Sequence, residues 1–175
     1  MAGGVVSLIG LAFLAVYVTG SLLPATRTGT AQADILATPA QVMAVTMDVS
    51  AQPRWRPDVH RVTGDASQVW TEHKHDGESI RFTVVERSAN ALTLAFESSR
   101  GYSGQWRGTM KALGRTTRLH VQESATINSP MQRVLARLFF HPDEFAAAYL
   151  ALLASEVERR YANASETSAT TGTAP

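Results

Sequence analysis

The feature that most constrains the fold is a series of six short segments with period-two alternation of apolar and polar residues between positions 59 and 128. Turn residues such as Asp76-Gly77 and Gly114-Arg115 separate the segments. Such alternation is typical of strands with one buried face, and connections this short favour hairpins. The six predicted antiparallel strands are 59–63, 68–74, 80–87, 91–97, 104–113 and 116–128.

Helical periodicity precedes and follows this series. Thr38-Pro39 begins a short helix, with Thr38 as its N-cap, after an extended segment at 28–36. From Pro130 apolar residues recur every three or four positions, and His141-Pro142 divides this region into a short and a longer helix. The predicted fold is α+β of the helix-grip type, with a curved antiparallel sheet of about seven strands wrapped on a long C-terminal helix. A strongly bent sheet leaves a gap that can hold a ligand.

The first 26 residues carry no charged side chain, and the run at 5–23 is apolar all round. About 20 such residues in a helix span the roughly 30 Å hydrocarbon layer of a bilayer. We expect an uncleaved N-terminal transmembrane helix as an anchor at 1–27, because the run is longer than that of a secretory signal and no basic residue precedes it. A signal cleaved after Ala31-Gln32-Ala33 is the alternative. Arg27 follows the span, which places the folded domain in the cytoplasm.

The rest of the chain divides into one folded domain at 28–162 and a tail at 163–175 that is predicted to be disordered, because it has no large apolar residue. The total of 175 residues and the 45% hydrophobic fraction suit a single core. A formal net charge of +1 is too small for a dedicated nucleic-acid binder. With no cysteine, the chain has no disulfide, thiolate metal site or cysteine nucleophile.

Six short segments carry a family pattern through their order along the chain. They are Ala37-Thr38-Pro39-Ala40-Gln41-Val42, Trp55-Arg56-Pro57-Asp58-Val59, Trp70-Thr71-Glu72, Val84-Val85-Glu86, Gly104-Gln105-Trp106 and Gly114-Arg115-Thr116-Thr117-Arg118-Leu119. In this order they resemble the START-like helix-grip superfamily, SRPBCC, in particular its polyketide cyclase/dehydrase and lipid-transport branch, over roughly residues 30–162. The resemblance implies a hydrophobic tunnel between the sheet and the C-terminal helix. It implies no single activity, because the superfamily includes carriers, receptors and cyclases.

Aromatic and aliphatic side chains on the apolar face of the sheet and on the C-terminal helices are the first candidates for ligand binding. They are Trp70, Phe82, Leu94, Phe96, Trp106, Met110, Leu138, Phe145 and Tyr149. Rigid aromatic rings with an adaptable methionine are typical of a cavity lining, although the same residues would also make an ordinary filled core. Trp70, Trp106 and Tyr149 stand out because their polar atoms need a partner when buried.

Three carboxylates complete the candidate set, because each is in phase with apolar neighbours on its strand. They are Glu72, Glu86 and Glu123. A buried carboxylate must be paired or protonated, and two that lie close together could supply the acid and the base of a cyclase. Pairing with Arg81, Arg107 or Arg118 at a strand end is the structural alternative.

No cofactor or metal site is predicted. His73 and His75 lie two apart on one strand face and could share a metal ion with a third ligand. The sequence indicates no third ligand, and Asp76-Gly77 favours a solvated hairpin end here.

The predicted function is binding of a hydrophobic or amphipathic small molecule, such as a lipid or a polyketide-like compound, in the tunnel of a membrane-anchored domain. An aromatase/cyclase-type enzyme is the first alternative, and a tethered platform for a protein partner is the second. A tunnel filled by side chains would contradict ligand binding. Two polar groups converging on the cavity would favour the enzyme, and a large exposed apolar patch would favour the platform.

Overall fold

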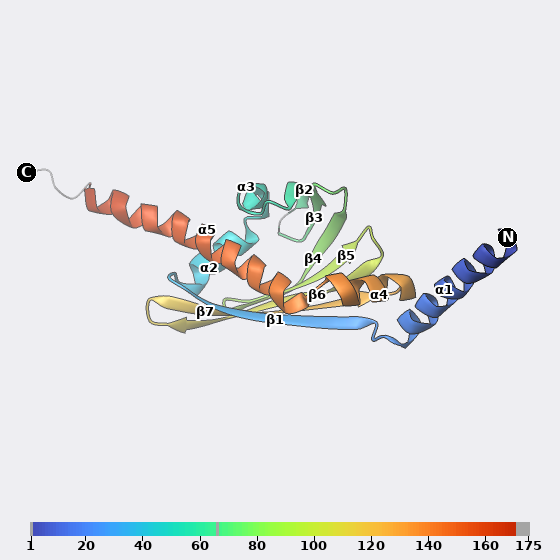
Figure 1. The fold of residues 1–175 in the computed structure, drawn as a ribbon. Coiled ribbons are helices and arrows are strands. Elements are labelled where there is room, and N and C mark those ends of the chain that lie inside the picture. The colour runs from blue at the N-terminus through green and yellow to red at the C-terminus, as the bar shows by residue number, and fades with distance from the viewer. Residues whose placement is uncertain (1, 66, 171–175) are drawn as a thin grey trace, which may run out of the picture.

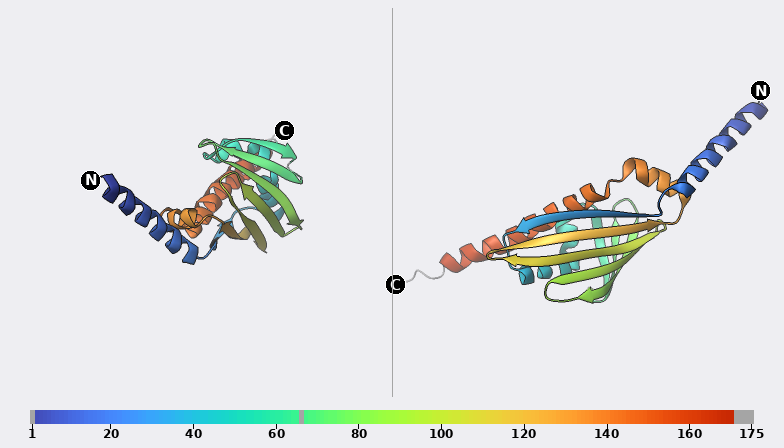
Figure 2. Two further views of the ribbon diagram at one scale, coloured as in Figure 1. Left: turned by 90° about the vertical axis from the view of Figure 1, so that its right-hand side faces the viewer. Right: turned by 90° about the horizontal axis from the view of Figure 1, so that it is seen from below.

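The computed structural model describes the backbone of residues 2–65 and 67–170, and the side chains of residues 10–65 and 67–161. Its main element is a seven-stranded antiparallel sheet with the strand order β1-β7-β6-β5-β4-β3-β2. Figure 1 shows the sheet beside the long helix α5 (Pro142–Thr170), and the left view of Figure 2 shows that the sheet curves around this helix. The predicted α+β helix-grip arrangement is confirmed.

The strands are β1 (Thr26–Ile35), β2 (Val59–Asp65), β3 (Val69–Lys74), β4 (Ser79–Arg87), β5 (Ala91–Ser98), β6 (Tyr102–Leu113) and β7 (Thr116–Ile127). Each begins and ends within two residues of its predicted bounds. The ends are well marked because Gly77 and Gly114 adopt positive φ angles at the hairpin turns, a backbone region that glycine enters without steric cost. The register between β4 and β5 shifts at a bulge between Val84 and Glu86.

Short helices connect β1 to β2 and β7 to α5. Helix α2 (Pro39–Met47) begins at Thr38, whose side chain accepts a hydrogen bond from the Gln41 backbone while the Gln41 side chain accepts one from the Thr38 backbone. A 3₁₀ turn at Val49–Ala51 leads into α3 (Gln52–Trp55), which packs on β2. Helix α4 (Pro130–Phe139) precedes α5, so the predicted division at His141-Pro142 is confirmed.

The hydrophobic core lies between the concave face of the sheet and the helices α2 and α5. Core side chains include Leu92 and Leu119 from the sheet and Val42 from α2. Helix α5 contributes Leu150 and Leu153. All five side chains are almost fully buried. The alternation of the strands and the helical spacing of α5 therefore meet in one apolar layer.

The β1 edge of the sheet is closed by the beginning of α5. The backbone N–H of Thr30 donates a hydrogen bond of 2.7 Å to the Asp143 carboxylate. Gly29 permits this approach, because a Cβ atom at this position would lie 2.4 Å from the backbone carbonyl carbon of Pro142. Helix α5 and strand β1 are consequently packed together along the sheet edge.

Helix α1 (Ala2–Leu22) extends away from the sheet and contacts α4 near its C-terminal end (Figures 1 and 2). Within the described part of the chain, no helix is long and apolar enough to cross a membrane. Residues 5–9 of the predicted span lie outside the residues whose side chains are described. The membrane anchor therefore stays a prediction.

The predicted tail at 163–175 begins inside α5, which continues to Thr170. Its side chains, and residues 171–175 altogether, lie outside the described residues. The boundary at residue 162 and the disorder beyond it stay predictions.

The packing of α5 on the sheet predicts a large loss of stability for Leu153→Ala. Removing this fully buried side chain leaves a cavity in the core, so the free energy of unfolding should fall by about 2–5 kcal/mol. Leu113→Ala, at the exposed end of β6, is the matched control and should cost less than about 1 kcal/mol. Urea denaturation of both variants measures the difference, and equal losses would contradict this account of the core.

Candidate functional site

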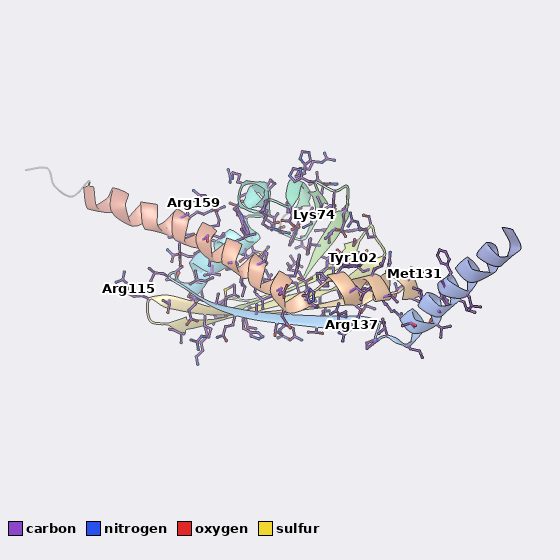
Figure 3. The ribbon with its side chains drawn as sticks, viewed as in Figure 1. Lys74, Tyr102, Arg115, Met131, Arg137 and Arg159 are labelled. Carbon is purple, nitrogen blue, oxygen red and sulfur yellow. The ribbon has the colours of Figure 1, made fainter. Side chains whose placement is uncertain are left out.

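A cavity of about 680 Å³ opens between one end of the sheet and the helices α4 and α5. Lys74 from β3 and Tyr102 from β6, both labelled in Figure 3, line it. Apolar lining comes from Ile80 and Ala125 on the sheet. The other apolar lining residues are Ile127, Leu135, Ala136, Phe140 and Phe145. The space between the sheet and the helices α4 and α5 is therefore not filled by side chains.

A second cavity of about 80 Å³ continues from the first toward the core. The residues that line both cavities are Lys74, Ile80, Tyr102, Glu123 and Phe145. Its aromatic walls include Trp70, which stacks on Phe82 at a ring-centroid distance of 5.4 Å, and Trp106, which meets Tyr149 edge-on at 5.9 Å. The hollow thus narrows from an open apolar mouth to an inner part with aromatic walls.

A buried ion cluster lies at this inner end. Arg56 follows the last turn of α3, and its Nη1 atom donates hydrogen bonds to Glu72 Oε1 at 2.9 Å and to Gln52 Oε1 at 2.8 Å. Its Nη2 atom lies 3.1 Å from Asp58 Oδ2. Lys74 also donates a hydrogen bond to Asp58. Two cations and two carboxylates are thereby joined in one network at the end of the hollow.

Electrostatics keep Arg56 and Asp58 ionised. Burial works against the charged form of Arg56, but the carboxylates of Glu72 and Asp58 outweigh it and raise the pKa of the guanidinium above its usual value. Burial likewise opposes ionisation of Asp58, yet Arg56 and Lys74 hold its pKa below the usual range. The guanidinium carbon of Arg56 also lies 5.6 Å from the centre of the Tyr149 ring, a cation–π distance.

Two buried polar atoms beside the inner cavity have no hydrogen-bond partner among the residues that the structure describes. One is Glu72 Oε2, on a residue that is 1% exposed, and the other is Trp70 Nε1, on a residue that is 2% exposed. The Nζ atom of Lys74 is 3.7 Å from Glu72 Oε2, within ion-pair range but too far for a hydrogen bond. Since unpaired buried polar groups are costly, these atoms mark places where a ligand group would be stabilised.

Glu123 is a carboxyl group whose protonation changes near neutral pH. It lies on β7 opposite Trp106 and lines both cavities. Burial raises its pKa to about 7, against the opposing attraction of Arg56 and Lys74. Burial also raises the pKa of Tyr149 to about 12, and raises that of Tyr102 with help from the nearby Glu78 carboxylate. The hollow therefore holds a carboxyl group that can exchange a proton at neutral pH, beside two phenols that stay protonated.

Nine of the twelve residues proposed from the sequence line one or both cavities. They are Trp70, Glu72, Phe82, Leu94, Phe96, Trp106, Glu123, Phe145 and Tyr149. The structure brings them together from β3, β4, β5, β6, β7 and α5. Whether they contact a ligand stays a prediction.

The other three lie outside both cavities. The expectation that Glu86 points inward is wrong, because the bulge after Val84 ends the alternation and leaves Glu86 exposed. Met110 is buried in the core, four residues beyond Trp106 on the same face of β6. Leu138 is 62% exposed, because the face of α4 that borders the cavity carries Gln132, Leu135 and Ala136.

Sequence reasoning missed the cationic half of the site. The expected partners for the inward carboxylates were Arg81, Arg107 and Arg118, but the structure pairs Glu72 with Arg56 and Lys74. Alternation within a strand cannot indicate a partner that comes from a helix end. The available signal was that Arg56 stands in one of the segments that carry the family resemblance.

His73 and His75, near the hairpin end, are not part of any group of described residues that could hold a metal ion. Among the described residues, no group of three or more His, Cys, Asp or Glu side chains could hold a metal ion. The His73 ring instead hydrogen-bonds Thr63 and Ser79, at 3.0 and 3.1 Å. The His75 ring meets that of His60 edge-on at a centroid distance of 5.1 Å.

Comparison with known proteins shows that most of the chain matches one family model. Residues 26–158 match the family model described as polyketide cyclase / dehydrase and lipid transport. No curated protein matches the sequence.

Solved structures with the same fold have low sequence identity to this chain. The Zhui aromatase/cyclase from Streptomyces sp. R1128 is 14% identical, with a TM-score of 0.65 over 78% of this chain and 96% of that one. A START superfamily protein from Mycobacterium smegmatis is 14% identical, with a TM-score of 0.57 over 75% and 97%. Norcoclaurine synthase from Thalictrum flavum, solved with dopamine and hydroxybenzaldehyde, is 10% identical, with a TM-score of 0.59 over 79% and 87%. These similarities establish the fold.

The buried ion pair predicts that Arg56→Ala is strongly destabilising. Removing the guanidinium takes away the hydrogen-bonded partner of the buried Glu72 carboxylate and leaves only its longer ion pair with Lys74, so the free energy of unfolding should fall by about 3–5 kcal/mol. Arg118→Ala, which breaks an exposed Arg–carboxylate pair with Asp34, is the matched control and should have a much smaller effect. Adding Glu72→Gln to Arg56→Ala should restore part of the loss in chemical denaturation, and no restoration would argue against charge burial as the cause.

The raised pKa of Glu123 predicts a pH-dependent effect of Glu123→Gln. Between its ordinary pKa of 4.5 and the folded value of about 7, the folded chain binds more protons than the unfolded chain, so this carboxyl lowers stability as pH rises through that window. Glu123→Gln removes this loss. Relative to the wild type, the variant should therefore be more stable at about pH 8 than at about pH 5. Exposed Glu97→Gln is the control, and parallel pH profiles for all three proteins would refute the assignment.

Proposed function

We propose that this chain, which belongs to the polyketide cyclase/dehydrase and lipid transport family, binds a hydrophobic or amphipathic small molecule in the hollow between its sheet and the helices α4 and α5. The single observation that carries the proposal is the cavity of about 680 Å³, a volume within the usual range for small-molecule sites. Its apolar mouth suits the hydrophobic part of such a ligand. Its inner end, with Glu72 Oε2 and Trp70 Nε1 unpaired, suits a polar group.

The charges around the hollow favour a neutral or cationic polar group over an anionic one. The cations that line the two cavities, histidine apart, are Arg56, Lys74 and Arg100. The acids are Asp58, Glu72, Asp76, Glu78 and Glu123. Five acids exceed three cations, and the cations are already paired with carboxylates. A hydroxyl or an amine can donate a hydrogen bond to Glu72 or Glu123, whereas a carboxylate would be repelled.

An enzyme of the aromatase/cyclase type is the second candidate, and the convergence of polar groups on the hollow favours it. Glu123, Tyr102 and Lys74 line the same space, and Glu123 has a pKa of about 7, suitable for taking and returning a proton at neutral pH. The Zhui aromatase/cyclase and norcoclaurine synthase share the fold. In this reading Glu123 is the proton-transfer group and Lys74 an electrostatic partner for developing negative charge.

The proposal includes a membrane tether at 5–23, with the folded domain on the cytoplasmic side. Support comes from the absence of charge in the first 26 residues and from Arg27 after the span. Large apolar side chains of α1 are exposed in the described part of the helix. They are Leu11, Phe13, Leu14, Tyr17, Val18 and Leu22.

Native mass spectrometry of the full chain tests ligand binding directly. The chain is incubated with three amphiphiles that share a dodecyl tail and carry an alcohol, an amine or a carboxylate. The alcohol and the amine should be retained and the carboxylate should not, because the hollow has an excess of acids. Preferential retention of the carboxylate would overturn the charge argument.

A pair of alanine-to-tryptophan variants shows whether the retained molecule lies in the hollow. Ala125 lines the cavity on β7, so Ala125→Trp should fill it and weaken binding by at least about tenfold. Ala112→Trp places the same side chain at an exposed position on the neighbouring strand β6 and should leave binding unchanged. Equal retention by both variants would place the amphiphile elsewhere and contradict the proposal.

A further inference from the structure

Helix α4 exposes an apolar face beside the mouth of the cavity. Leu138 and Phe139 lie three and four residues after Leu135, so both share a side of the helix with it. They are 52%, 62% and 77% exposed. The charged residues of α4 are Arg133 and Arg137, and the helix has no acid. A short helix with an apolar face and only basic charges is typical of segments that lie in a membrane interface.

The same helix is fixed to the end of α1. A Cβ atom at Gly20 would lie 2.0 Å from the Pro130 carbonyl oxygen, so the two backbones are in close contact at this glycine. The Arg27 guanidinium donates hydrogen bonds to the carbonyl oxygens of Ala136 and Phe140, at 2.6 and 2.7 Å. Arg133 in turn binds the carbonyl oxygen of Ile127 at 2.8 Å. Helix α4 therefore lies against the C-terminal turns of α1, as Figure 1 shows, and the two arginines attach it to the ends of β1 and β7.

Helix α4 also forms one wall of the cavity mouth. Gln132, Leu135 and Ala136 line the cavity, together with Phe140 immediately after the helix. Leu135 therefore belongs both to the cavity lining and to the exposed apolar face. Any partner that binds the exposed apolar face of α4 would therefore lie next to the opening of the cavity.

We propose that the apolar face of α4 (Leu135, Leu138 and Phe139) docks on a lipid bilayer beside α1, so that the cavity opens at the membrane surface. A bilayer is the occupant that these observations favour, because the neighbouring helix α1 also exposes large apolar side chains and the exposed charge on α4 is that of Arg137. Arginine side chains beside apolar surface can keep their charged ends among lipid headgroups. The docking itself does not require a ligand. The consequence that a ligand could pass between bilayer and cavity without crossing water rests on the proposed function.

Single-cysteine labelling tests the docking, because the natural chain has no cysteine. Leu138→Cys in the full chain carries an environment-sensitive fluorophore, and Val85→Cys, exposed on β4, is the matched control. Each protein is reconstituted into vesicles of phosphatidylcholine and phosphatidylglycerol. Nitroxide-labelled lipid should quench the label at 138 several-fold more than the label at 85. Aqueous iodide should show the opposite order.

Two outcomes would overturn the docking. One is equal iodide quenching at the two positions, which would mean that the face of α4 is in water. The other is protection of position 138 only when the protein-to-lipid ratio is raised, which would assign the face to a second copy of the chain. Ala125→Trp introduced beside Leu138→Cys separates docking from ligand binding. It should weaken retention of the amphiphile by at least about tenfold and leave lipid quenching at position 138 unchanged.

Discussion

The contact between Arg56 and Glu72 is the interaction on which the inner end of the hollow depends. The arginine comes from the end of α3 and the carboxylate from β3, and the guanidinium also lies over the Tyr149 ring of α5. Three elements that are distant in the sequence are therefore joined through one side chain. A fully apolar contact of similar size could be equally stable, because burying two charges costs much of what their attraction gains. Its advantage here is chemical, since it keeps polar atoms inside an otherwise apolar grip.

The cluster also explains why the neighbouring acids behave differently. Glu72 is buried against a guanidinium, and Asp58 is held ionised by Arg56 and Lys74. Glu123 faces the same hollow without a hydrogen bond or ion pair of its own within the described residues, so burial dominates and its pKa rises to about 7. Closely spaced carboxylates in one cavity thus have separate roles, two of them structural and one available for protons. Such separation is what a binding site with a polar inner end, or a proton-transfer site, requires.

The sequence predicted what depends on local pattern and failed where a contact depends on the assembled fold. Alternation located six strands, the extended segment at 28–36 corresponds to β1, and the Thr38 N-cap was predicted from its own neighbourhood. Glu86 was misplaced because a single bulge reverses the side-chain direction and leaves no mark in the pattern. The Arg56–Glu72 pair was missed because it joins a helix end to a strand sixteen positions away. Leu138 was assigned to the cavity because helical spacing shows which residues share a face of α4, but not which face the sheet covers.

The two edges of the sheet differ in their capacity to pair with another chain. On β1, the N–H of Thr30 is already bonded to Asp143, and the start of α5 packs against Gly29. An additional strand would have to displace α5 to pair there. At the opposite edge, most side chains of β2 are exposed, and a register shift between Val59 and Arg61 interrupts its pairing with β3. Strand addition, whether in a regulated complex or in aggregation, is consequently restricted to β2, and α5 protects the fold from polymerising through its longer edge strand.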